Sequence, residues 1–333
     1  MVKDWEAFNR LENKKFNRIL QIFERLMKGE VIAKNVEAER FGVSPKSIQR
    51  DIKDLMNYLA DTCSDEGDTE ILYDRERKGY YLCRNQHQWL SNQEILALTK
   101  VLLESRAFNE NEMNQLLDKL AMQSFPPERD HIKELIRNER FYYQHPQHQK
   151  DLLDLIWDAA AAVREQLQAE ITYTKIREDQ VVQRQILPQG LVFSEYYFYL
   201  IAYIKGSDYK YPAIYRLDRI QDLHISKDHF PVPDGKRFEE GKLRQRIQFM
   251  QAGELMTIRF RYWGLSLEAV MDRLPTAHII KKDGNSTIVE AEIFGEGIKM
   301  WLLSQAQYLE VLKPERLREE MKRTIAAMAD IYT

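Results

Sequence analysis

The stretch EYYFYLIAYIK, residues 195–205, decides how the central part of this chain folds. Its side chains fall into two alternating sets. One set contains Phe198, Leu200, Ala202 and Ile204, and the other contains Tyr197, Tyr199, Ile201 and Tyr203. A period of two is typical of a β-strand, because successive side chains point to opposite faces of a sheet. The first set predicts a core face, whereas the second carries three phenol hydroxyls that need another explanation.

The tyrosine face has two interpretations. It is either a solvent-facing surface, where tyrosine has good strand propensity, or a binding groove in which the rings offer stacking surfaces and hydroxyl groups. Arg184, Arg216 and Arg219 lie near in the sequence, and guanidinium groups beside aromatic planes suit a nucleotide or a single-stranded nucleic acid. In a straight strand Arg216 and Arg219 face opposite ways, so both serve one groove only if a bulge or a strand end intervenes.

Further strand-like runs surround this stretch within residues 170–226. They are EITYTKI, VVQRQILPQGLVF and YKYPAIYRLDRIQDLHIS, and the segments REDQ, SE and KGSD between the runs are turn-like. Several short strands with such turns predict a small antiparallel β-barrel. We place this barrel at residues 167–235.

The N-terminal part of the chain predicts a helix-turn-helix. Residues 14–28 place apolar side chains at helical spacing, and AKNVEAERFG predicts a second helix that ends at Gly42. A third helix begins near Pro45, which suits the first helical position, and Ser44 is placed to cap its N-terminus. Two helices joined by a tight turn at a glycine form the helix-turn-helix arrangement.

The third helix has two distinct faces. Its apolar face carries Ile48, Ile52, Leu55 and Leu59. The opposite face carries Lys46, Arg50 and Lys53, with Ser47 and Gln49 at the sides. A basic outer face suits the major groove, where arginine bonds guanine edges, glutamine bonds adenine edges and lysine reaches phosphates. The alternative is an ordinary solvated helix, on which mixed charges are common.

A basic hairpin is predicted directly after this helix. In EILYDRERKGYYLCR, residues 70–84, two short apolar runs flank a turn near Gly79, and Arg75, Arg77 and Lys78 lie along the tip. A basic hairpin beside a recognition helix is well placed to contact backbone phosphate as a wing. Residues 1–84 are therefore predicted to be a winged helix-turn-helix domain.

Residues 85–166 are predicted to be mainly helical. Three helical segments are separated by the breakers FPPERD and QHPQHQ, and Ser91 or Asn92 caps the first segment. His131, His145 and His148 invite a metal interpretation, but loop histidines without a cysteine or carboxylate cluster are usually polar loop residues. We interpret this region as a helical connector and a candidate dimer surface, without a metal site.

The C-terminal part, residues 251–333, predicts a separate α+β domain. Its pattern reads strand, helix, strand, a DGN turn, strand, helix, strand and helix. This is a βαββαβ-like order followed by a terminal helix. The whole chain is thus predicted to be a multidomain α+β protein.

The composition narrows the class of protein. The 333 residues are 44% hydrophobic and 30% charged, with a net charge of -3, which fits two or three globular domains. We find no apolar stretch of membrane-spanning length and no secretory signal, so a cytoplasmic location is expected. The two cysteines, Cys63 and Cys83, cannot form a disulfide framework. No phosphate loop, nucleophile elbow or metal-ligand cluster is present, so neither an enzyme nor a cofactor is expected.

Three portions of the chain resemble bacterial transcriptional regulators. VEAERFGVSPKSIQRDIKDL followed by RKGYYL resembles the winged helix-turn-helix of DeoR-like regulators. ILPQGLVF, FSEYYFYLIAYIKGSD and IYRLDRI resemble a WYL domain, named for a Trp-Tyr-Leu strand that stands here as Phe198, Tyr199 and Leu200. WLLSQAQYLEVLKPERLREEM resembles the WCX-type extension that follows many WYL domains.

The WYL resemblance implies an Sm-like or SH3-like barrel that senses a nucleotide or nucleic-acid ligand. It implies that Tyr199, Arg216 and Arg219 line the groove and that Phe198 and Leu200 lie in the core. In this sequence Phe198 replaces the tryptophan, which is harmless if that side chain only fills the core. Ala213 stands where many members carry a further arginine, which implies a less anionic ligand or a partly degenerate site.

Together these features predict a homodimeric regulator that binds a double-stranded DNA operator. Its predicted ligand residues are Tyr197, Tyr199, Arg184, Arg216 and Arg219. The effector is expected to be a nucleotide or a short nucleic acid. The alternative is a partner-binding or nucleic-acid-binding scaffold that does not read DNA bases.

Overall fold

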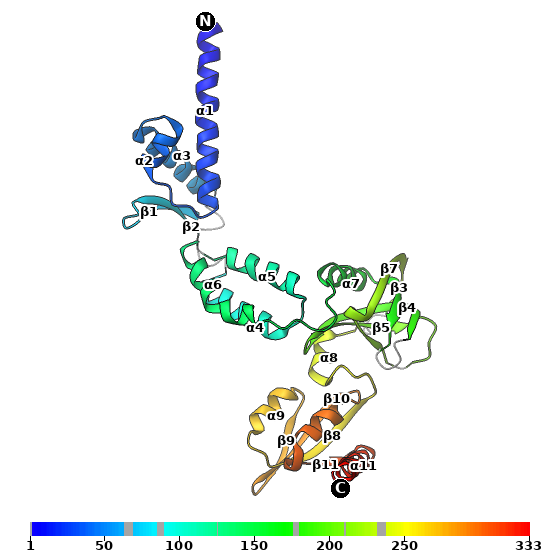
Figure 1. Cartoon of the computed structure of the whole chain (residues 1–333). Coiled ribbons are helices and arrows are strands. Elements are labelled where there is room, and N and C mark those ends of the chain that lie inside the picture. The colour runs from blue at the N-terminus through cyan, green and yellow to red at the C-terminus, as the bar shows by residue number, and fades with distance from the viewer. Residues whose placement is uncertain are drawn as a thin grey trace. The chain divides into compact units, whose positions relative to one another are not determined.

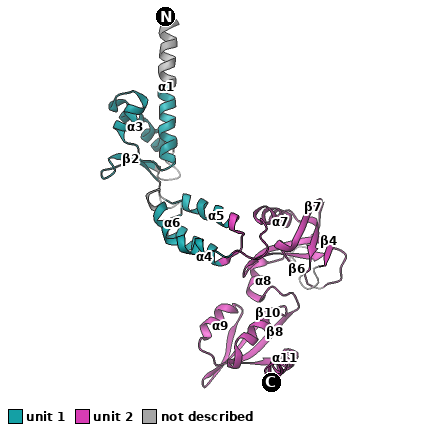
Figure 2. Ribbon diagram, viewed as in Figure 1, with its two compact units in different colours: residues 1–104, 113–144 teal, residues 105–112, 145–333 magenta. Residues whose placement is uncertain are grey.

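The computed structural model describes residues 2–62, 69–84, 90–124, 126–175, 180–209, 211–231 and 238–333. The chain divides into two compact units (Figure 2). Unit 1 contains residues 1–104 and 113–144, and unit 2 contains residues 105–112 and 145–333. Cys63, most of the turn expected at 177–180 and the expected barrel end at 235 lie outside the described residues.

The first part of unit 1 has the expected winged-helix elements (Figure 1). They are α1 (Val2–Met27), α2 (Lys34–Phe41), α3 (Pro45–Thr62), β1 (Thr69–Asp74) and β2 (Gly79–Arg84). Gly42 ends α2 in the left-handed conformation, with φ 60°, which a glycine adopts without steric cost. Apolar side chains from α1, α2, α3 and the β1–β2 hairpin share one core. Helix α1 begins earlier than the sequence pattern predicted.

The β1–β2 hairpin is tied to the chain that precedes α2. Ile32 and Tyr80 exchange backbone hydrogen bonds of 2.7 and 2.8 Å, which forms an isolated antiparallel β-bridge to the hairpin. A Cβ atom at Gly79 would lie 2.5 Å from the Val31 side chain, so this close approach requires a glycine. The hairpin is therefore held beside the start of α2.

The remaining part of unit 1 is helical. It consists of α4 (Asn92–Ser105), α5 (Glu110–Met122) and α6 (Pro126–Phe141). The expectation that FPPERD, residues 125–130, breaks the helices is wrong, because α6 begins there at Pro126, and a proline is tolerated in the first turn of a helix. The Ser91 hydroxyl accepts a hydrogen bond from the Glu94 backbone N–H, and the Glu94 carboxylate accepts one from the Ser91 N–H, which is a reciprocal capping box. Lys100 pairs with Glu139, and Arg140 pairs with Asp118 at 2.7 Å, so α6 is linked to both α4 and α5.

Unit 2 contains the predicted strands as a five-stranded antiparallel sheet. The strands are β3 (Leu167–Thr174), β4 (Val181–Ser194), β5 (Tyr197–Ile204), β6 (Ala213–Arg216) and β7 (Ile220–His229). Their order is β6-β5-β4-β3-β7, a meander whose last strand returns beside the first. Helix α7 (Leu153–Glu165) packs on one face, where Leu152 and Ala159 join a core with Leu200 and Ala202. Helix α7 therefore belongs to the fold of this sheet.

Phe198 occupies a different position from Leu200. Leu200 is fully buried, as expected, but Phe198 is only partly buried at the edge of the same core. Its ring lies 5.0 Å from that of Phe193 and 5.6 Å from that of Phe108, measured between centroids. Phe108 belongs to the turn between α4 and α5, so Phe198 also holds that turn against the sheet.

The tyrosine face of β5 is not an open, solvent-facing surface. Ile201 is completely buried on it, together with Val192 of β4. The cover is α8 (Glu240–Arg246), whose Leu243 packs there with the following Ile247 and Met250. Tyr199 packs against this cluster and is half-buried. The interpretation as a simple solvent-facing surface is therefore wrong, because the segment after the sheet folds back over it.

The C-terminal part of unit 2 has the predicted order of elements. It consists of β8 (Leu255–Tyr262), α9 (Leu267–Arg273), β9 (His278–Asp283), β10 (Ser286–Phe294), α10 (Ile298–Ser304), β11 (Leu309–Lys313) and α11 (Glu315–Ile331). The antiparallel sheet has the order β11-β8-β10-β9. Phe260 and Trp301 lie in its core, with their ring centroids 6.0 Å apart. Within the described ranges, no helix is both long and apolar enough to cross a membrane.

Candidate nucleic-acid interface and ligand site

The sequence of α3 fixes which of its faces is exposed. Ile48, Ile52, Leu55 and Leu59 are each at most 5% exposed, so the predicted apolar face is in the core. Lys46, Gln49, Arg50 and Lys53 are exposed, and Ser47 is partly exposed. Lys46, Arg50 and Lys53 form no ion pair with any residue that the structure describes. Their charges are therefore available to a partner.

The orientation of α3 is secured by charges on α1. The buried Asp51 carboxylate accepts a hydrogen bond of 2.6 Å from Arg18 Nε, and Asp54 pairs with Lys15 at 2.9 Å. At the N-terminus of α3, the Ser44 hydroxyl accepts a hydrogen bond of 3.2 Å from the Ser47 backbone N–H. Ser44 thus caps the helix, as predicted. Asp51 lies within the basic segment but turns inward, so it does not neutralise the exposed face.

The tip of the hairpin is basic and exposed. Arg75, Arg77 and Lys78 are exposed between β1 and β2. The Asp74 carboxylate accepts hydrogen bonds from the backbone N–H groups of Glu76 and Arg77 at 2.8 and 3.0 Å. It also lies 3.5 Å from Arg77 Nε. The turn is therefore preorganised by Asp74, and its basic side chains extend from a fixed backbone.

Unit 2 contains a polar hollow where β3, β6 and β7 meet the chain before α7. Its volume is about 380 Å³, and it is lined by Gln147, His148, Lys150, Thr174, Arg216, Asp218, Arg219 and Gln221. We call these eight residues the cationic hollow. Strand β6 ends at Arg216, and a 3-10 turn at Leu217–Arg219 follows. This strand end brings Arg216 and Arg219 to one hollow, which a straight strand would not do.

Arg216 is held by an aromatic ring and a carboxylate. Its guanidinium carbon lies 3.4 Å from the centroid of the Tyr197 ring. Its Nε and Nη2 atoms donate to the two oxygens of Asp218 at 3.0 and 2.7 Å, a bidentate pair. Burial opposes the charge of Arg216, but the hydrogen bond and the charge of Asp218 prevail and raise the pKa of Arg216. Arg216 is therefore a permanently charged and fixed group.

Lys150 and Arg219 are held by neutral backbone groups instead. Lys150 Nζ donates to the carbonyl oxygen of Ile220 at 2.9 Å, and Arg219 Nη1 donates to that of Lys175 at 3.1 Å. Neither forms an ion pair with a described residue. A carbonyl orients a cation without cancelling its charge. The hollow thus contains three cationic side chains and one carboxylate, Asp218.

His148 completes the hollow. Its Nδ1 atom accepts a hydrogen bond of 3.1 Å from the backbone N–H of Lys150, which places the ring proton on Nε2. Nε2 is buried and lacks a hydrogen-bond partner among the described residues. Burial lowers the pKa of His148, and the nearby charges of Arg216 and Lys150 add to this, although Asp218 opposes them. His148 is therefore neutral near pH 7.

The loop that carries His148 and Lys150 is fastened to the turn between α4 and α5. Asn109 Nδ2 donates to the Gln149 carbonyl at 3.3 Å and to the Asp151 carboxylate at 2.7 Å. The Glu112 carboxylate accepts hydrogen bonds of 2.8 Å from the backbone N–H groups of Leu152 and Leu153 at the start of α7. Burial raises the pKa of Glu112, although these hydrogen bonds oppose the rise.

The structure brings together some of the predicted ligand residues and separates others. Arg216 and Arg219 line the hollow, and the guanidinium of Arg216 stacks on the ring of Tyr197. Tyr199 pairs with Arg216 across β5 and β6, but it packs toward α8, where burial raises its pKa to about 12. Arg184 lies two residues before the buried Ile186 on β4, so both side chains belong to the face of the sheet that α7 covers. This is the face opposite to the one that carries Arg216, and Arg184 is exposed there.

Ala213 does not contribute to the hollow. It pairs with Ala202 on the face that α7 covers, whereas Arg216 pairs with Tyr199 on the other face. The residues that sequence reasoning missed are Gln147, Lys150, Thr174, Asp218 and Gln221. Asp218 could have been found between the two arginines of YRLDRI, because a carboxylate two residues from an arginine can pair with it. The sequence holds no comparable signal for Lys150.

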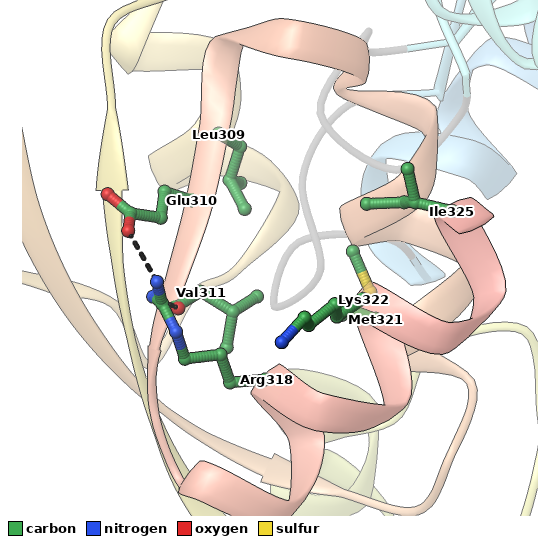
Figure 3. Close-up of a pocket in the computed structure, with 7 residues that line it drawn as sticks. All are labelled: Leu309, Glu310, Val311, Arg318, Met321, Lys322 and Ile325. Carbon is green, nitrogen blue, oxygen red and sulfur yellow. Dashed lines mark hydrogen bonds and ion pairs between the residues drawn. The ribbon is translucent and has the colours of Figure 1, made fainter. Parts of the chain in front are cut away.

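A second pocket lies in the C-terminal part of unit 2, between β11 and α11 (Figure 3). Its volume is about 280 Å³, and its apolar lining includes Leu309, Met321 and Ile325. Arg318 donates to the Val311 carbonyl at 2.5 Å and pairs with Glu310 at 2.9 Å, so its charge is already compensated. This pocket is less suited to an anion than the cationic hollow. Within the described residues, no group of three His, Cys, Asp or Glu side chains is placed to hold a metal ion.

Two segments of unit 2 match known protein families. Residues 154–225 match the WYL domain, and residues 242–329 match the WCX domain. The chain thus contains one segment similar to the WYL domain and, after it, one segment similar to the WCX domain. The WYL match includes α7 and the five-stranded sheet up to β7, and the WCX match includes α8 and the C-terminal sheet.

Individual relatives were also found. The "Uncharacterized HTH-type transcriptional regulator YobV" of Bacillus subtilis (strain 168) is 22% identical over 336 residues, which cover 96% of this chain and 99% of that protein. Among solved structures, proteasome accessory factor B/C (PafBC) of Arthrobacter aurescens is 17% identical with a TM-score of 0.29, and the match covers 92% of this chain. The chain spans only 47% of that PafBC chain. A CRISPR Cas-related protein is 15% identical with a TM-score of 0.37, over 96% of this chain and 84% of that one.

Proposed function

We propose that this WYL protein is a transcriptional regulator that binds double-stranded DNA through its winged helix. The observation that carries the proposal is the exposed face of α3, where Lys46, Gln49, Arg50 and Lys53 stand opposite a fully buried apolar face. Such a helix suits insertion into the major groove, and a basic hairpin beside it suits phosphate contacts. The similarity to a protein named as an HTH-type transcriptional regulator supports this proposal.

The cationic hollow is proposed as the place where an effector acts. Its three cationic side chains favour an anionic ligand, and we infer a nucleotide or a short nucleic acid. An effector changes DNA affinity only if it binds the DNA-competent and the incompetent states with different affinity. The hollow must therefore be linked physically to the part of the chain that binds DNA.

The turn between α4 and α5 is the proposed link. Its residues 105–112 belong to unit 2, whereas the helices on either side of it continue into unit 1. Asn109 in this turn and Glu112 at the start of α5 bind the backbone of residues 149–153, directly beside His148 and Lys150. A ligand that moves the 147–150 loop would therefore pull on the end of α4 and the start of α5.

The active form is proposed to be a homodimer that binds two half-sites. One winged helix provides few base contacts, and paired half-sites are the usual way to increase affinity and specificity. The helical connector and the C-terminal extension are the candidate dimer surfaces. Light scattering at micromolar concentration, with and without DNA, is expected to give twice the mass of one chain. A monomer mass under both conditions would contradict the dimer.

The test begins with recovery of genomic DNA bound to the full chain. A recovered fragment is then titrated in a gel-shift assay against a scrambled fragment of equal length. Specific binding is typically at least about 10³-fold tighter than non-specific binding. Equal affinity for both fragments at physiological salt would contradict the regulator and favour the alternative, a scaffold that does not read bases.

The proposed link is tested by Asn109→Ala, which removes two hydrogen bonds to the 149–151 segment and also the 2.9 Å hydrogen bond that Asn109 Oδ1 accepts from the Glu112 backbone N–H at the start of α5. This variant is expected to bind the operator normally and to lose the change in affinity that the effector causes. Glu110→Gln, an exposed change in the same segment, is the control. If both variants retain the full response, the α4–α5 turn is not the link.

A further inference from the structure

The cationic hollow extends beyond the residues that match the WYL domain. Gln147, His148 and Lys150 line it, but the match begins at residue 154. These residues come from the loop before α7, which Asn109 and Glu112 fasten in place. The hollow of this chain is thus built from two parts, a strand end with Arg216 and Arg219 and a separate loop with Lys150.

The charge of the hollow matches a particular kind of anion. Asp218 is committed to Arg216, whereas Lys150 and Arg219 contact only backbone carbonyls among the described residues. Three cations and one carboxylate leave two positive charges uncompensated. A terminal phosphate carries about −1.5 to −2 charges at pH 7, whereas a phosphodiester carries one. The terminal phosphate therefore compensates the hollow more fully.

The hollow also provides neutral donors for phosphate oxygens. The protonated Nε2 atom of His148 lacks a partner within the described part of the chain. The Thr174 hydroxyl oxygen accepts a hydrogen bond of 3.1 Å from Gln221 Nε2, so the hydroxyl hydrogen can be donated elsewhere. A phosphate with three peripheral oxygens can accept bonds from these donors and from Lys150 and Arg219 together.

The described lining of the hollow is rich in charge and has no large aromatic side chain. Among the described residues it contains no phenylalanine, tyrosine or tryptophan. Its flat groups are the His148 ring and the guanidinium groups of Arg216 and Arg219. Arg216 already stacks on the Tyr197 ring, with its guanidinium carbon 3.4 Å from the ring centroid, and pairs with Asp218. Charged groups and hydrogen-bond donors therefore dominate the surface that a ligand would meet here.

We propose that the cationic hollow binds the terminal phosphate of a phosphate monoester through Lys150, Arg219 and His148, and that it does not recognise a base. The Arg216–Asp218 pair forms the fixed wall of this site. The proposal rests on the proposed function only for the idea that an effector binds here. It is tested without DNA, so its failure and a failure of DNA regulation can be told apart.

The ligand class is tested by calorimetric titration of the full chain with five small probes. AMP, UMP and ribose 5-phosphate are expected to bind within about threefold of one another, since they share the terminal phosphate. Cyclic AMP has the same base and sugar as AMP but is a diester, and its binding is expected to be at least about tenfold weaker. Adenosine is expected not to bind. Binding of adenosine or cyclic AMP as tightly as AMP, or of AMP far more tightly than UMP, would overturn the proposal.

The role of the loop is tested by Lys150→Gln. Loss of a charged hydrogen bond to phosphate is expected to weaken AMP binding about tenfold or more. Lys150→Arg keeps the charge and is expected to restore most of the affinity. Lys205→Gln is the matched control, because Lys205 is also a lysine of this sheet that donates to a neutral oxygen, at 2.7 Å, but does not line the hollow. Equal AMP affinity for Lys150→Gln and Lys205→Gln would remove the loop from the site.

Discussion

The exposed face of α3 and the cationic hollow carry the same kinds of side chain, but they are built differently. On α3, Lys46, Arg50 and Lys53 follow one another on a single helix, and an apolar face behind them fixes their direction. In the hollow, Lys150, Arg216 and Arg219 come from separate segments and are held by carbonyls, a carboxylate and a ring. The α3 cations are exposed, whereas those of the hollow are held by neighbouring groups, so we expect the first set to suit a long polyanion and the second a small one.

This difference predicts that the two sites fail independently when the core of one is damaged. Ile52→Ala removes a side chain that is 1% exposed beneath the basic face of α3. It is expected to destabilise the winged helix by about 2–5 kcal/mol and to abolish operator binding. AMP binding by the hollow should be unchanged, because Ile52 lies in unit 1 and the hollow in unit 2.

The measurements are urea unfolding, gel shift and calorimetry on the same preparation. Ile52→Val, which removes only one methylene, serves as the control and is expected to cost about 0.5–1.5 kcal/mol. A parallel loss of AMP binding in Ile52→Ala would mean that the hollow depends on the folded winged helix, and the contrast between the two regions would not hold.

The next largest effect is expected at Arg50 and concerns base recognition. Arg50→Ala should weaken operator binding by about 1–3 kcal/mol and relax the base preference at one position. Arg50→Lys sharpens the result, because lysine keeps the charge but loses the planar fork that bonds guanine at two points. If Arg50 reads a base, both variants lose specificity in a gel-shift comparison of mutated operators.

The outcome that contradicts base reading by Arg50 is a uniform loss across all operator sequences, with Arg50→Lys close to the unmodified chain. Arg50 would then be a phosphate contact. Asn57→Ala, an exposed change on the same helix, is the control for non-specific effects of substitution in α3.

The sequence was sufficient to predict features that depend on neighbouring residues. It was insufficient to predict features that are built from residues far apart in the chain. The spacing of Ile48 and Ile52 predicted the buried face of α3, and Gly42 and Ser44 predicted the turn and the cap. Each of these depends on neighbours within a few residues, so periodicity reveals it. The order of the strands and helices in both parts of unit 2 was predictable for the same reason.

The hollow depends on contacts between residues far apart in the chain. Lys150 bonds to Ile220, and Arg219 bonds to Lys175, across separations that no sequence period encodes. The cover on the tyrosine face was unpredictable for the same reason, since α8 follows the sheet and folds back on Tyr199 and Ile201. Arg184 was grouped with Arg216 by proximity in sequence, although strand pairing places it on the other face.

A smaller effect is expected from the hairpin, whose basic side chains are exposed at its tip. Arg77→Glu reverses a charge at the exposed tip. It is expected to weaken binding to every duplex similarly and to make the affinity less dependent on salt, because fewer counterions are released on binding. The measurement is the slope of affinity against salt concentration for two unrelated duplexes, with Lys205→Glu in unit 2 as the matched charge reversal. An unchanged slope and affinity at low salt would exclude the hairpin from the interface.

The smallest effect is expected at His148 and depends on pH. Burial lowers the pKa of His148 in the folded chain, and the charges of Arg216, Lys150 and His145 lower it further. The charge of Asp218 opposes this change. The ring of Tyr197 also faces His148, with the two centroids 6.4 Å apart, but it carries no charge. The unfolded chain has the ordinary histidine value of about 6.5. As the pH falls below about 6.5, the unfolded state therefore takes up a proton first, and the folded state loses stability until the lowered pKa is reached. His148→Asn cannot bind this proton but still offers an oxygen to the Lys150 N–H, so it should lose less stability than the unmodified chain between pH 7.5 and 5.5. Urea unfolding at both pH values measures the difference, and NMR titration of the His148 ring measures the pKa directly. Bound AMP should raise the pKa of His148, because the phosphate stabilises the charged ring. If both chains lose the same stability between the two pH values and the pKa of His148 is ordinary, His148 is not buried among cations.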